Sequence, residues 1–538
     1  MRDVTTDVVT VIDMSTRPLT STDVIVIGGG PVGIALAIDL HLRGVRCQVI
    51  ERHATLQNIP KGQNLTQRTM EYLARLGAEE SVRNGRTITA PGIGGMTVYG
   101  TLTSGIEYDW LVRSKVADFY HRSSERIPQP ITEQGLRDHA ASLGIPISYG
   151  WTAELISSGD DEVVIRSENR AGEIVESAAR YAVACDGAGS RIREAAGITQ
   201  SRVDHDKRMA LTVFRSPELD EAVSAHPDRQ FFTVINQKHD GYWQFAGRVD
   251  SDSRWFFHAP VADDETDETL DVTALVADAV GYPVALDTEY VGFWDLRFAI
   301  ADDYRSGRVF VAGDAAHSHP PYGGYGVNSG LEDAANLAWK LAFALDTGDE
   351  AILDSYDEER RPIFESTAAD FIDRSIREDR SFLRQFSPAD REAFDAEWLR
   401  RADFAATEVG RYEPHYGDSS LVLEGVGTTT AVGDHVVHAR PGHRLTPWSP
   451  HDTALFDALG RGFTLLTTAQ SAPSASEAAA TIGIDLTVVQ IEAEAAAAYG
   501  AHRVLVRPDL YIAAIGETDT DVATALATAT ATAAPVAR

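Results

Sequence analysis

The sequence has 538 residues, more than one hydrophobic core can organise, so roughly two or three domains are expected. Hydrophobic residues make up 43% and charged residues 24%, as in ordinary globular proteins. The formal net charge of −32 argues against nucleic acid or an anionic membrane as a partner, because both bind basic surfaces. The only two cysteines, Cys47 and Cys185, lie far apart, which excludes a disulfide framework, argues against a metal site and favours a reducing, cytoplasmic location.

The first twenty residues lack the basic start and apolar centre of a signal peptide. Residues 1–20 are expected to form a flexible N-terminal arm. No apolar run reaches the roughly eighteen residues of a membrane helix, so no membrane association is predicted.

A strand, a glycine turn, a helix and a second strand are predicted from Asp23 onward, in DVIVIGGGPVGIALAIDLHLRGVRCQVIER. Gly28, Gly30 and Gly33 fit G-x-G-x-x-G between the first strand and the helix. Glu51 ends the second strand, where a carboxylate can bind ribose hydroxyls while the helix N-terminus binds a pyrophosphate. The combination predicts a dinucleotide-binding unit.

The later elements follow in four groups. Amphipathic helices are predicted at 64–77 and 131–144, and a strand ends on Asp186. Residues 205–300 contain alternating strands rich in aromatic residues. A strand, a turn and a helix follow from 307 to 342, and after about residue 400 strands alternate with alanine-rich helices.

Two acidic turns follow predicted strands, CDGAGSRIR at 185–193 and AGDAAHSHPP at 312–321. Together with the N-terminal glycine motif, they make the chain resemble the flavoprotein aromatic hydroxylases, the single-component FAD monooxygenases of the para-hydroxybenzoate and phenol hydroxylase type. The resemblance covers roughly residues 22–370 and continues more weakly to about 515. It implies an α/β fold: a Rossmann-like FAD-binding domain, an inserted β-rich substrate domain and a C-terminal thioredoxin-like domain.

The implied domain boundaries are 21–200 with 295–400 for a discontinuous FAD-binding domain, 201–294 (with parts of 90–130) for the substrate domain, and 405–538 for the thioredoxin-like domain. The last of these contains no cysteine, so thiol–disulfide chemistry is impossible there. We expect it to have a structural role or to stabilise a homodimer.

The resemblance also assigns the cofactor site. Gly28, Gly30, Pro31 and Gly33 would hold the FAD pyrophosphate, Glu51 with Arg52 the adenosine ribose side, Arg68 the flavin side, and Gln129, Asp186, Gly313 and Asp314 other parts of the cofactor, Asp314 the ribityl chain. Pro321, Gly324, Gly326, Val327 and Asn328 would lie against the isoalloxazine ring, with the helix that starts near Asn328 directed at its pyrimidine edge. Tyr325 departs from the family, which usually has glutamine there.

The reaction implied by the resemblance is hydroxylation of a small phenolic ring, as in phenol degradation. NADH or NADPH would reduce the flavin, and O2 would then form a flavin C4a-hydroperoxide that attacks the ring. Only one dinucleotide motif is present, so the nicotinamide is expected to bind in a transient groove.

The catalytic side chains are less clearly indicated. Gln63 stands where phenol hydroxylase relatives carry an acid, and it can orient a hydroxyl but not deprotonate it. Tyr242, His258 and His317 are candidates for the general base by position, and Arg297 is a candidate for the flavin or the substrate pocket. The aromatic residues of the region predict an apolar pocket without a carboxylate clamp, which favours a neutral phenol over a benzoate; they are Tyr242, Trp243, Phe245, Trp255 and Phe257.

The sequence bears on three alternative functions. A flavin halogenase is discounted, because no two tryptophans stand two residues apart as its W-x-W-x-I-P signature requires. Hydroxylation of a larger polycyclic or antibiotic aromatic, as a tailoring or inactivating step, stays open. A flavoprotein that senses a ligand without turnover also stays open, although the intact Gly-Asp motif argues against it.

Overall fold

The computed structural model describes residues 16–88, 94–239, 241–450 and 453–532. Residues 1–15 of the predicted N-terminal arm lie outside this part of the chain. Its last residues lie on the protein: the Thr16 amide donates to the Ile147 carbonyl at 3.1 Å, and the Leu19 amide donates to Gln48 Oε1 at 2.8 Å.

The first of the two large sheets has the strand order β16-β17-β10-β1-β2-β7, and β8 and β9 extend it beside β10. Its core strands β17, β10, β1, β2 and β7 are parallel; β10 is buried over its last four residues and the others over most of their length, as expected for the apolar runs of a parallel sheet. The strands are β1 (Ser21–Ile27), β2 (Cys47–Glu51), β7 (Ile147–Tyr149), β8 (Trp151–Ser158), β9 (Val163–Asn169), β10 (Ile174–Ala184), β16 (Arg305–Ser306) and β17 (Val309–Val311).

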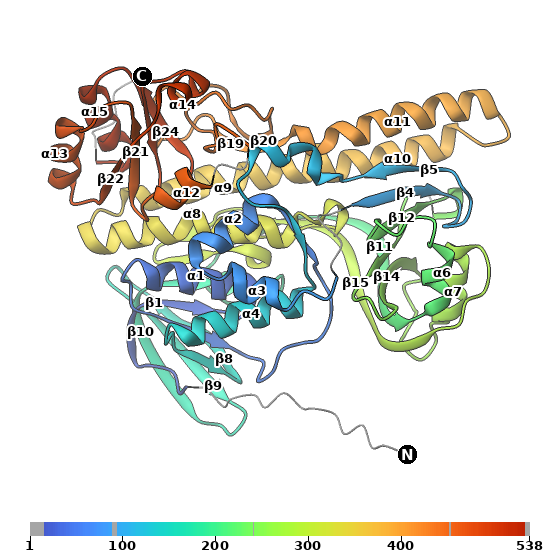
Figure 1. Cartoon of the computed structure of the whole chain (residues 1–538). Coiled ribbons are helices and arrows are strands. Elements are labelled where there is room, and N and C mark those ends of the chain that lie inside the picture. The colour runs from blue at the N-terminus through green and yellow to red at the C-terminus, as the bar shows by residue number, and fades with distance from the viewer. Residues whose placement is uncertain (1–15, 89–93, 240, 451–452, 533–538) are drawn as a thin grey trace, which may run out of the picture.

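Helices cover this sheet (Figure 1). Helix α1 packs against α4 and against the long helix α8, which crosses the middle of the molecule. The helices of this part are α1 (Pro31–Leu42), α2 (Gln67–Leu76), α3 (Glu79–Asn84), α4 (Gln129–Ser142), α5 (Arg191–Ala195), α8 (Gly326–Thr347) and α9 (Ser355–Ser366). This layered arrangement is Rossmann-like.

The second large sheet has the order β18-β15-β11-β14-β13-β12-β4-β5. Its strands are β4 (Gly95–Tyr99), β5 (Glu107–Trp110), β11 (Gln200–Arg215), β12 (Phe231–Ile235), β13 (Trp243–Arg248), β14 (Arg254–Val261), β15 (Asp287–Ala301) and β18 (His317–Ser318); helices α6 (Pro217–Ala222) and α7 (Val272–Val280) flank it. The long strand β15 runs across the predicted domain boundary at residue 294 and leads the chain back to the first sheet.

Two further parts complete the molecule (Figure 1). Helices α10 (Arg374–Gln385) and α11 (Arg391–Arg411) extend over the second sheet, with Phe382 of α10 against Phe394 of α11 at 5.4 Å between ring centroids. Beyond the small pair β19 (Tyr412–Tyr416) and β20 (Thr429–Val432), a four-stranded sheet of order β22-β21-β23-β24 forms the C-terminal unit. It comprises α12 (Ala454–Ala458), β21 (Phe463–Thr467), α13 (Pro473–Ile482), β22 (Leu486–Gln490), α14 (Ala493–Tyr499), β23 (Arg503–Val506), β24 (Ile512–Gly516) and α15 (Asp519–Ala529).

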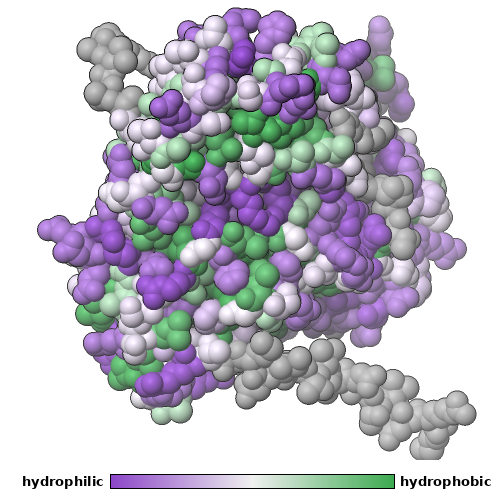
Figure 2. Space-filling model, turned by 60° about the vertical axis from the view of Figure 1, so that its left-hand side comes forward, coloured by the Kyte–Doolittle hydropathy of each residue, from purple (hydrophilic) through white to green (hydrophobic). Residues whose placement is uncertain are grey.

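The predicted fold class is therefore confirmed: a Rossmann-like sheet is joined to a β-rich sheet and a separate C-terminal α/β unit. Figure 2 shows one face of the molecule, covered mostly by hydrophilic residues with hydrophobic ones in separate groups. None of the helices in the described ranges has the length and apolar character needed to cross a membrane.

Candidate functional site

A cavity of about 550 Å³ joins the carboxyl ends of the parallel strands to one face of the second sheet. Such strand ends are where α/β sheets bind ligands. The cavity is lined by most of the residues predicted from the sequence: Gly28, Gly30, Pro31, Glu51, Arg52, Gln63, Gln129, Asp186, His258, Asp314, Pro321, Gly324, Gly326 and Val327.

The turn between β1 and α1 needs its glycines for two different reasons. Gly28 has a φ of +111°, and a Cβ there would lie 2.2 Å from the carbonyl oxygen of Cys185. Gly33 does not line the cavity, because it packs the helix onto the turn: its Cβ would lie 2.0 Å from the Gly28 carbonyl oxygen. At Gly30, by contrast, a Cβ would meet nothing within 4 Å, because the cavity lies in front of it.

Helix α1 begins at Pro31 with no side chain capping its first turn. Its free N–H groups and positive dipole end therefore face the cavity, as in sites that bind phosphate. Glu51 stands beside this turn at the end of β2, where its carboxylate accepts hydrogen bonds from the Gly29 amide at 2.6 Å and the His53 amide at 2.7 Å. Arg137 donates to the Gly29 carbonyl at 3.1 Å.

Two aspartates face the cavity from the ends of β10 and β17. Burial raises the pKa of Asp186 above its ordinary value, and Oδ2 accepts from the Arg191 amide at 3.1 Å. The side chain of Asp314 is exposed to the cavity. Partial desolvation by the cavity walls raises the pKa of its carboxyl above the ordinary value. Both are suited to accept hydrogen bonds from sugar or ribityl hydroxyls.

Gly313 lies behind Asp314 and does not line the cavity. Its amide donates to Asp333 Oδ2 at 3.0 Å, and the same carboxylate binds His317 at 2.7 Å and Arg360 at 2.8 Å. Asp333, His317 and Arg360 are all buried. His317, a candidate base from the sequence, is thus committed to holding the Gly-Asp turn in place.

The second glycine loop also lines the cavity. Gly326 and Val327 begin α8, whose first turn has no side-chain cap, and a Cβ on Gly326 would come no closer than 3.7 Å to His319. Asn328 is turned away from the cavity and fixes the loop: it donates to the Gly324 carbonyl at 2.7 Å and to the Asn64 carbonyl at 2.8 Å.

Three other predicted residues lie outside the cavity lining. Arg68 points from α2 toward the C-terminal unit, where it pairs with Glu332 at 2.8 Å and hydrogen-bonds the Tyr511 hydroxyl. Tyr242 is buried, with the Arg380 guanidinium 5.0 Å from its ring centroid. Arg297 lies half-buried on β15. The structure thus does not bring these three side chains to the site.

The substrate-sheet end of the cavity is aromatic, but with different residues from those predicted. Phe231, Phe245 and Phe256 line it, with ring centroids 5.6 Å apart for Phe231–Phe245 and 5.4 Å apart for Phe245–Phe256. Trp255 and Phe257 point to the other face of β14, because successive side chains on a strand alternate. Of the five aromatic residues predicted to form the pocket, Phe245 lines the cavity, whereas Tyr242, Trp243, Trp255 and Phe257 do not.

His258 lines the cavity next to Phe256, and burial lowers its pKa to about 4. Its Nδ1 accepts a hydrogen bond from Trp294 Nε1 at 3.2 Å. A neutral imidazole that accepts at Nδ1 carries its proton on Nε2. In this tautomer His258 offers a ligand a donor and not a basic nitrogen.

Arg126 and His319 are two of the polar lining residues that sequence reasoning missed. Burial lowers the pKa of His319 to about 4; its Nδ1 donates to the Pro320 carbonyl at 2.5 Å, and Nε2 has no hydrogen-bond partner in the described part of the chain. His319 is thus the neutral histidine with a free acceptor nitrogen. Its place one residue before the two prolines was the available signal.

Tyr325, the departure from the family pattern, points away from the cavity. It is buried, and its hydroxyl donates to Glu408 Oε1 of α11 at 3.1 Å, while Trp110 Nε1 donates to Oε2 at 3.0 Å. Burial raises the pKa of Glu408 above its ordinary value. The substitution therefore ties the glycine loop to α11.

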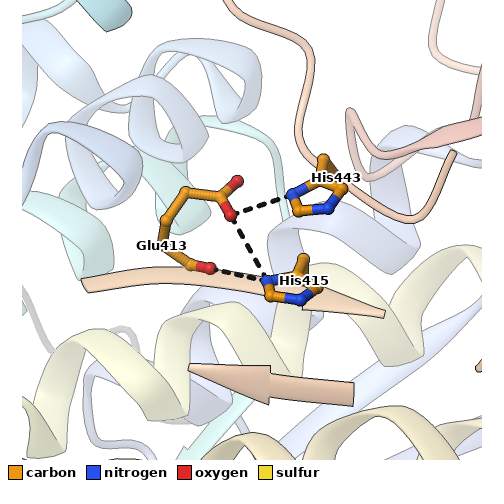
Figure 3. Close-up of side chains that lie close together, drawn as sticks. All are labelled: Glu413, His415 and His443. Carbon is orange, nitrogen blue, oxygen red and sulfur yellow. Dashed lines mark hydrogen bonds and ion pairs between the residues drawn. The ribbon is translucent and has the colours of Figure 1, made fainter. Parts of the chain in front are cut away.

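Figure 3 shows a group of three potential metal ligands far along the chain, Glu413, His415 and His443, where the sequence predicted no metal site. Glu413 Oε2 binds His443 Nδ1 at 2.9 Å and His415 Nδ1 at 3.3 Å, with Arg440 at 3.9 Å. Burial would raise the pKa of Glu413, but both histidine hydrogen bonds outweigh it and hold it at about 2. The three groups satisfy one another beside a guanidinium, so we assign them a structural role.

Comparisons with known proteins agree with this geometry. Residues 21–370 match the family model described as "FAD binding domain", and residues 438–534 match "Aromatic-ring hydroxylase, C-terminal". The chain belongs to the family of FAD-dependent aromatic-ring monooxygenases.

Individual relatives and solved structures are similar to most of the chain. The chain is 30% identical over 535 residues to a 4-methyl-5-nitrocatechol 5-monooxygenase of Burkholderia sp, covering 93% of this chain and 95% of the relative. It is 31% identical over 497 residues to a tetracenomycin B2 monooxygenase-dioxygenase of Streptomyces olivaceus, covering 86% and 87%. Among solved structures, the rebeccamycin biosynthetic enzyme RebC with reduced flavin matches with a TM-score of 0.82 and 28% identity, covering 96% of this chain and all of that one (100%).

Proposed function

We propose that this protein hydroxylates an electron-rich aromatic ring, using FAD, O2 and NADH or NADPH. The observation that carries the proposal is one continuous cavity, with a nucleotide-binding turn at one end and an aromatic wall at the other. That arrangement suits a reaction in which a bound flavin and an aromatic ring must meet.

The residues fit FAD. The open space at Gly30 and the uncapped start of α1 would accept the pyrophosphate, with Glu51 near the adenosine ribose and Asp314 near the ribityl chain. When bound, FAD would accept electrons from the nicotinamide and activate O2. The first N–H groups of α8, beside Gly326 and Val327, would stabilise negative charge on the ring edge nearest them.

Proton handling falls to His319 in this proposal. Its free Nε2 would accept a hydrogen bond from the hydroxyl of a phenolic substrate, which increases the negative charge on the ring oxygen and makes the ring more nucleophilic. Gln63 would orient the same or a neighbouring hydroxyl. The rings of Phe231, Phe245 and Phe256 would keep water from the reacting atoms.

The nicotinamide has no second dinucleotide motif to bind, so we propose a transient encounter at the cavity mouth. We also propose that the C-terminal unit is thioredoxin-like and supports a homodimer. The strand order β22-β21-β23-β24, with β23 antiparallel to both neighbours, supports the first idea, and sedimentation tests the second.

A larger polycyclic substrate is the second candidate. It is favoured by relatives whose names refer to tetracenomycin, rifampicin and tetracycline. It changes the substrate and leaves the assigned residues in the same roles.

The test is aerobic oxidation of NADH and NADPH by the FAD-loaded protein with monocyclic and polycyclic phenols, with hydrogen peroxide assayed in parallel. Many-fold faster oxidation with little peroxide and a hydroxylated product supports the proposal. Oxidation that yields only peroxide with every compound contradicts it.

A further inference from the structure

We propose that Arg126, with Gln63 and His258, forms an oxyanion-binding end of the cavity, so that the substrate is an aromatic acid and not a neutral phenol. The acidic group is a carboxylate or an equally acidic ring hydroxyl. This inference rests on the proposed function and names its substrate class.

Arg126 is a buried cation whose hydrogen-bond acceptors are all neutral. Its side chain lines the cavity from β6 (Glu125–Arg126), which pairs with β3 (Asn64–Leu65), and it is 3% exposed. It donates to Gln63 Oε1 at 2.8 Å, to Gln230 Oε1 at 3.4 Å and to the Arg248 carbonyl. Within the described ranges, no carboxylate lies within ion-pair distance of it. A buried charge is costly unless an opposite charge meets it.

Glu125, the acidic residue next to Arg126 in the sequence, is already paired with other arginines. Glu125 points to the other side of β6, where it binds Arg83 and also Arg86 at 3.2 Å. Burial and the neighbouring Arg248 lower the pKa of Arg126 to about 9, which still leaves the guanidinium charged at neutral pH. An anionic ligand is therefore the missing counter-charge.

A second polar group at this end also needs a partner. Gln63 is buried, and its Oε1 is taken by Arg126. Its Nε2 has no hydrogen-bond partner in the described chain. The amide thus presents N–H groups beside the guanidinium, and together they match the two oxygens of a carboxylate or of a catecholate.

The sheet places this group beside the aromatic wall. A Cβ on Gly247 would lie 3.1 Å from an Arg126 guanidinium nitrogen and 2.2 Å from the Phe256 ring. Gly247 and Phe256 are directly paired across β13 and β14, and His258 is two residues further on the same face. The ring centroids of His258 and Phe256 lie 5.7 Å apart. An aromatic ring stacked on this wall would lie within reach of both Arg126 and His258.

The test uses binding, which does not require turnover. Flavin absorbance changes give the Kd of FAD-loaded wild type, R126Q, R126K and a surface control, R215Q on β11. Two matched pairs serve as probes: 1-hydroxy-2-naphthoate with its amide, and 4-nitrocatechol with 4-methylcatechol. The first pair reports a carboxylate and the second an acidic hydroxyl.

We expect the wild type to bind at least one acid about 10-fold more tightly than its neutral partner, and R126Q to raise the Kd of that acid about 10- to 100-fold while the neutral partner changes little. We expect R126K, which keeps the positive charge but loses the two-pronged guanidinium, to bind the acid with a Kd between those of wild type and R126Q. R215Q should bind it with the same Kd as wild type.

Two results overturn the inference. One is a wild type that prefers neither acid, a result that needs no variant. The other is an R126Q protein that loses FAD or weakens acids and neutral probes alike, which would mean that Arg126 serves the flavin or the fold. Failure of the proposed function looks different: acids bind through Arg126, but no probe accelerates NADH or NADPH oxidation.

Discussion

The two ends of the cavity are built by different means. The nucleotide end consists of main-chain groups at the start of α1 and α8, with Glu51 and Asp314 next to the turns. The substrate end consists of side chains from β6, β12, β13 and β14, strands spread over more than a hundred residues. A cofactor shared by a family can be held by backbone, whereas a particular substrate has to be held by side chains.

Each end also has its own support. Behind the nucleotide end, the buried cluster of Asp333, His317 and Arg360 fixes the Gly313 turn. Behind the substrate end, neutral groups such as Trp294 set the hydrogen-bonding state of a wall residue. Damage to the first should therefore affect stability and FAD together, and damage to the second should affect substrate alone.

The largest expected effect is that of D333A. It leaves His317 buried without its carboxylate partner and leaves Arg360 with only the more distant carboxylate of Glu332, at 3.5 Å, which costs about 3–5 kcal/mol. We expect a large fall in the thermal midpoint and loss of FAD on gel filtration. D346A, at an exposed position of the same helix α8, should leave both unchanged. Equal FAD retention by D333A and D346A would contradict a role for the cluster in the nucleotide end.

The same cluster sets a pH dependence. Burial would raise the pKa of Asp333, but His317 and Arg360 outweigh it, so the pKa lies below the ordinary value. The stabilisation is then fully present above about pH 4 and is lost as the pH falls through the lower folded pKa. Acid unfolding of wild type should be steeper than that of D333A, measured by tryptophan fluorescence. Parallel acid transitions would refute this assignment.

G30A tests the nucleotide end without disturbing the fold. The added methyl group meets no protein atom within 4 Å, so the free protein should keep its thermal midpoint. In the complex it would occupy cofactor space at about 1–3 kcal/mol, which raises the Kd for FAD roughly 5- to 150-fold. The matched control is G410A in α11, also with open space, which should leave FAD binding unchanged. FAD titration followed by fluorescence measures this Kd. Equal Kd values for G30A and wild type would mean that Gly30 does not belong to the FAD site.

The nucleotide end could be predicted from the sequence because its signals are local. Gly28, Gly30 and Glu51 lie on one strand–turn–helix–strand unit, and the Gly313–Asp314 pair directly follows another strand. Fold class followed from the same units. Arg68 is the exception, since its side chain turns to Glu332 and Tyr511, both distant in the sequence.

The substrate end could not be predicted in the same way, because strand register decides which face a side chain takes. Phe256 and Phe257 are neighbours, yet one lines the cavity and the other packs behind the sheet. Arg126 gave no local signal, because its meaning depends on the absence of acids around it in space. Tyr242, a candidate by position alone, packs against Arg380, and neither it nor Arg297 lines the cavity.

The W294F substitution tests the substrate end alone. Without the donor from Trp294, His258 Nδ1 loses its partner and the imidazole is free to take either tautomer. The loss of one hydrogen bond, about 1 kcal/mol, should weaken binding of the preferred aromatic probe roughly 5-fold. The Kd for FAD should not change, and W448F in the C-terminal unit should behave as wild type. An unchanged probe Kd would show that His258 does not donate to the ligand.

Y325F has the smallest expected effect, and it tests whether the family departure belongs to either end. The variant removes one of two donors to the buried Glu408 carboxyl and leaves the tilted ring contact with Tyr412, 4.6 Å between centroids, in place. The loss should be about 1 kcal/mol of stability, seen as a small drop in the thermal midpoint. Because the hydroxyl points to α11 and away from the cavity, the Kd values for FAD and for the aromatic probes should match wild type. Y282F, at an exposed tyrosine, is the control that should change neither quantity. A shift in the flavin spectrum or in probe binding would instead mean that the Glu408 contact governs the glycine loop, and the two ends would then be coupled through α11.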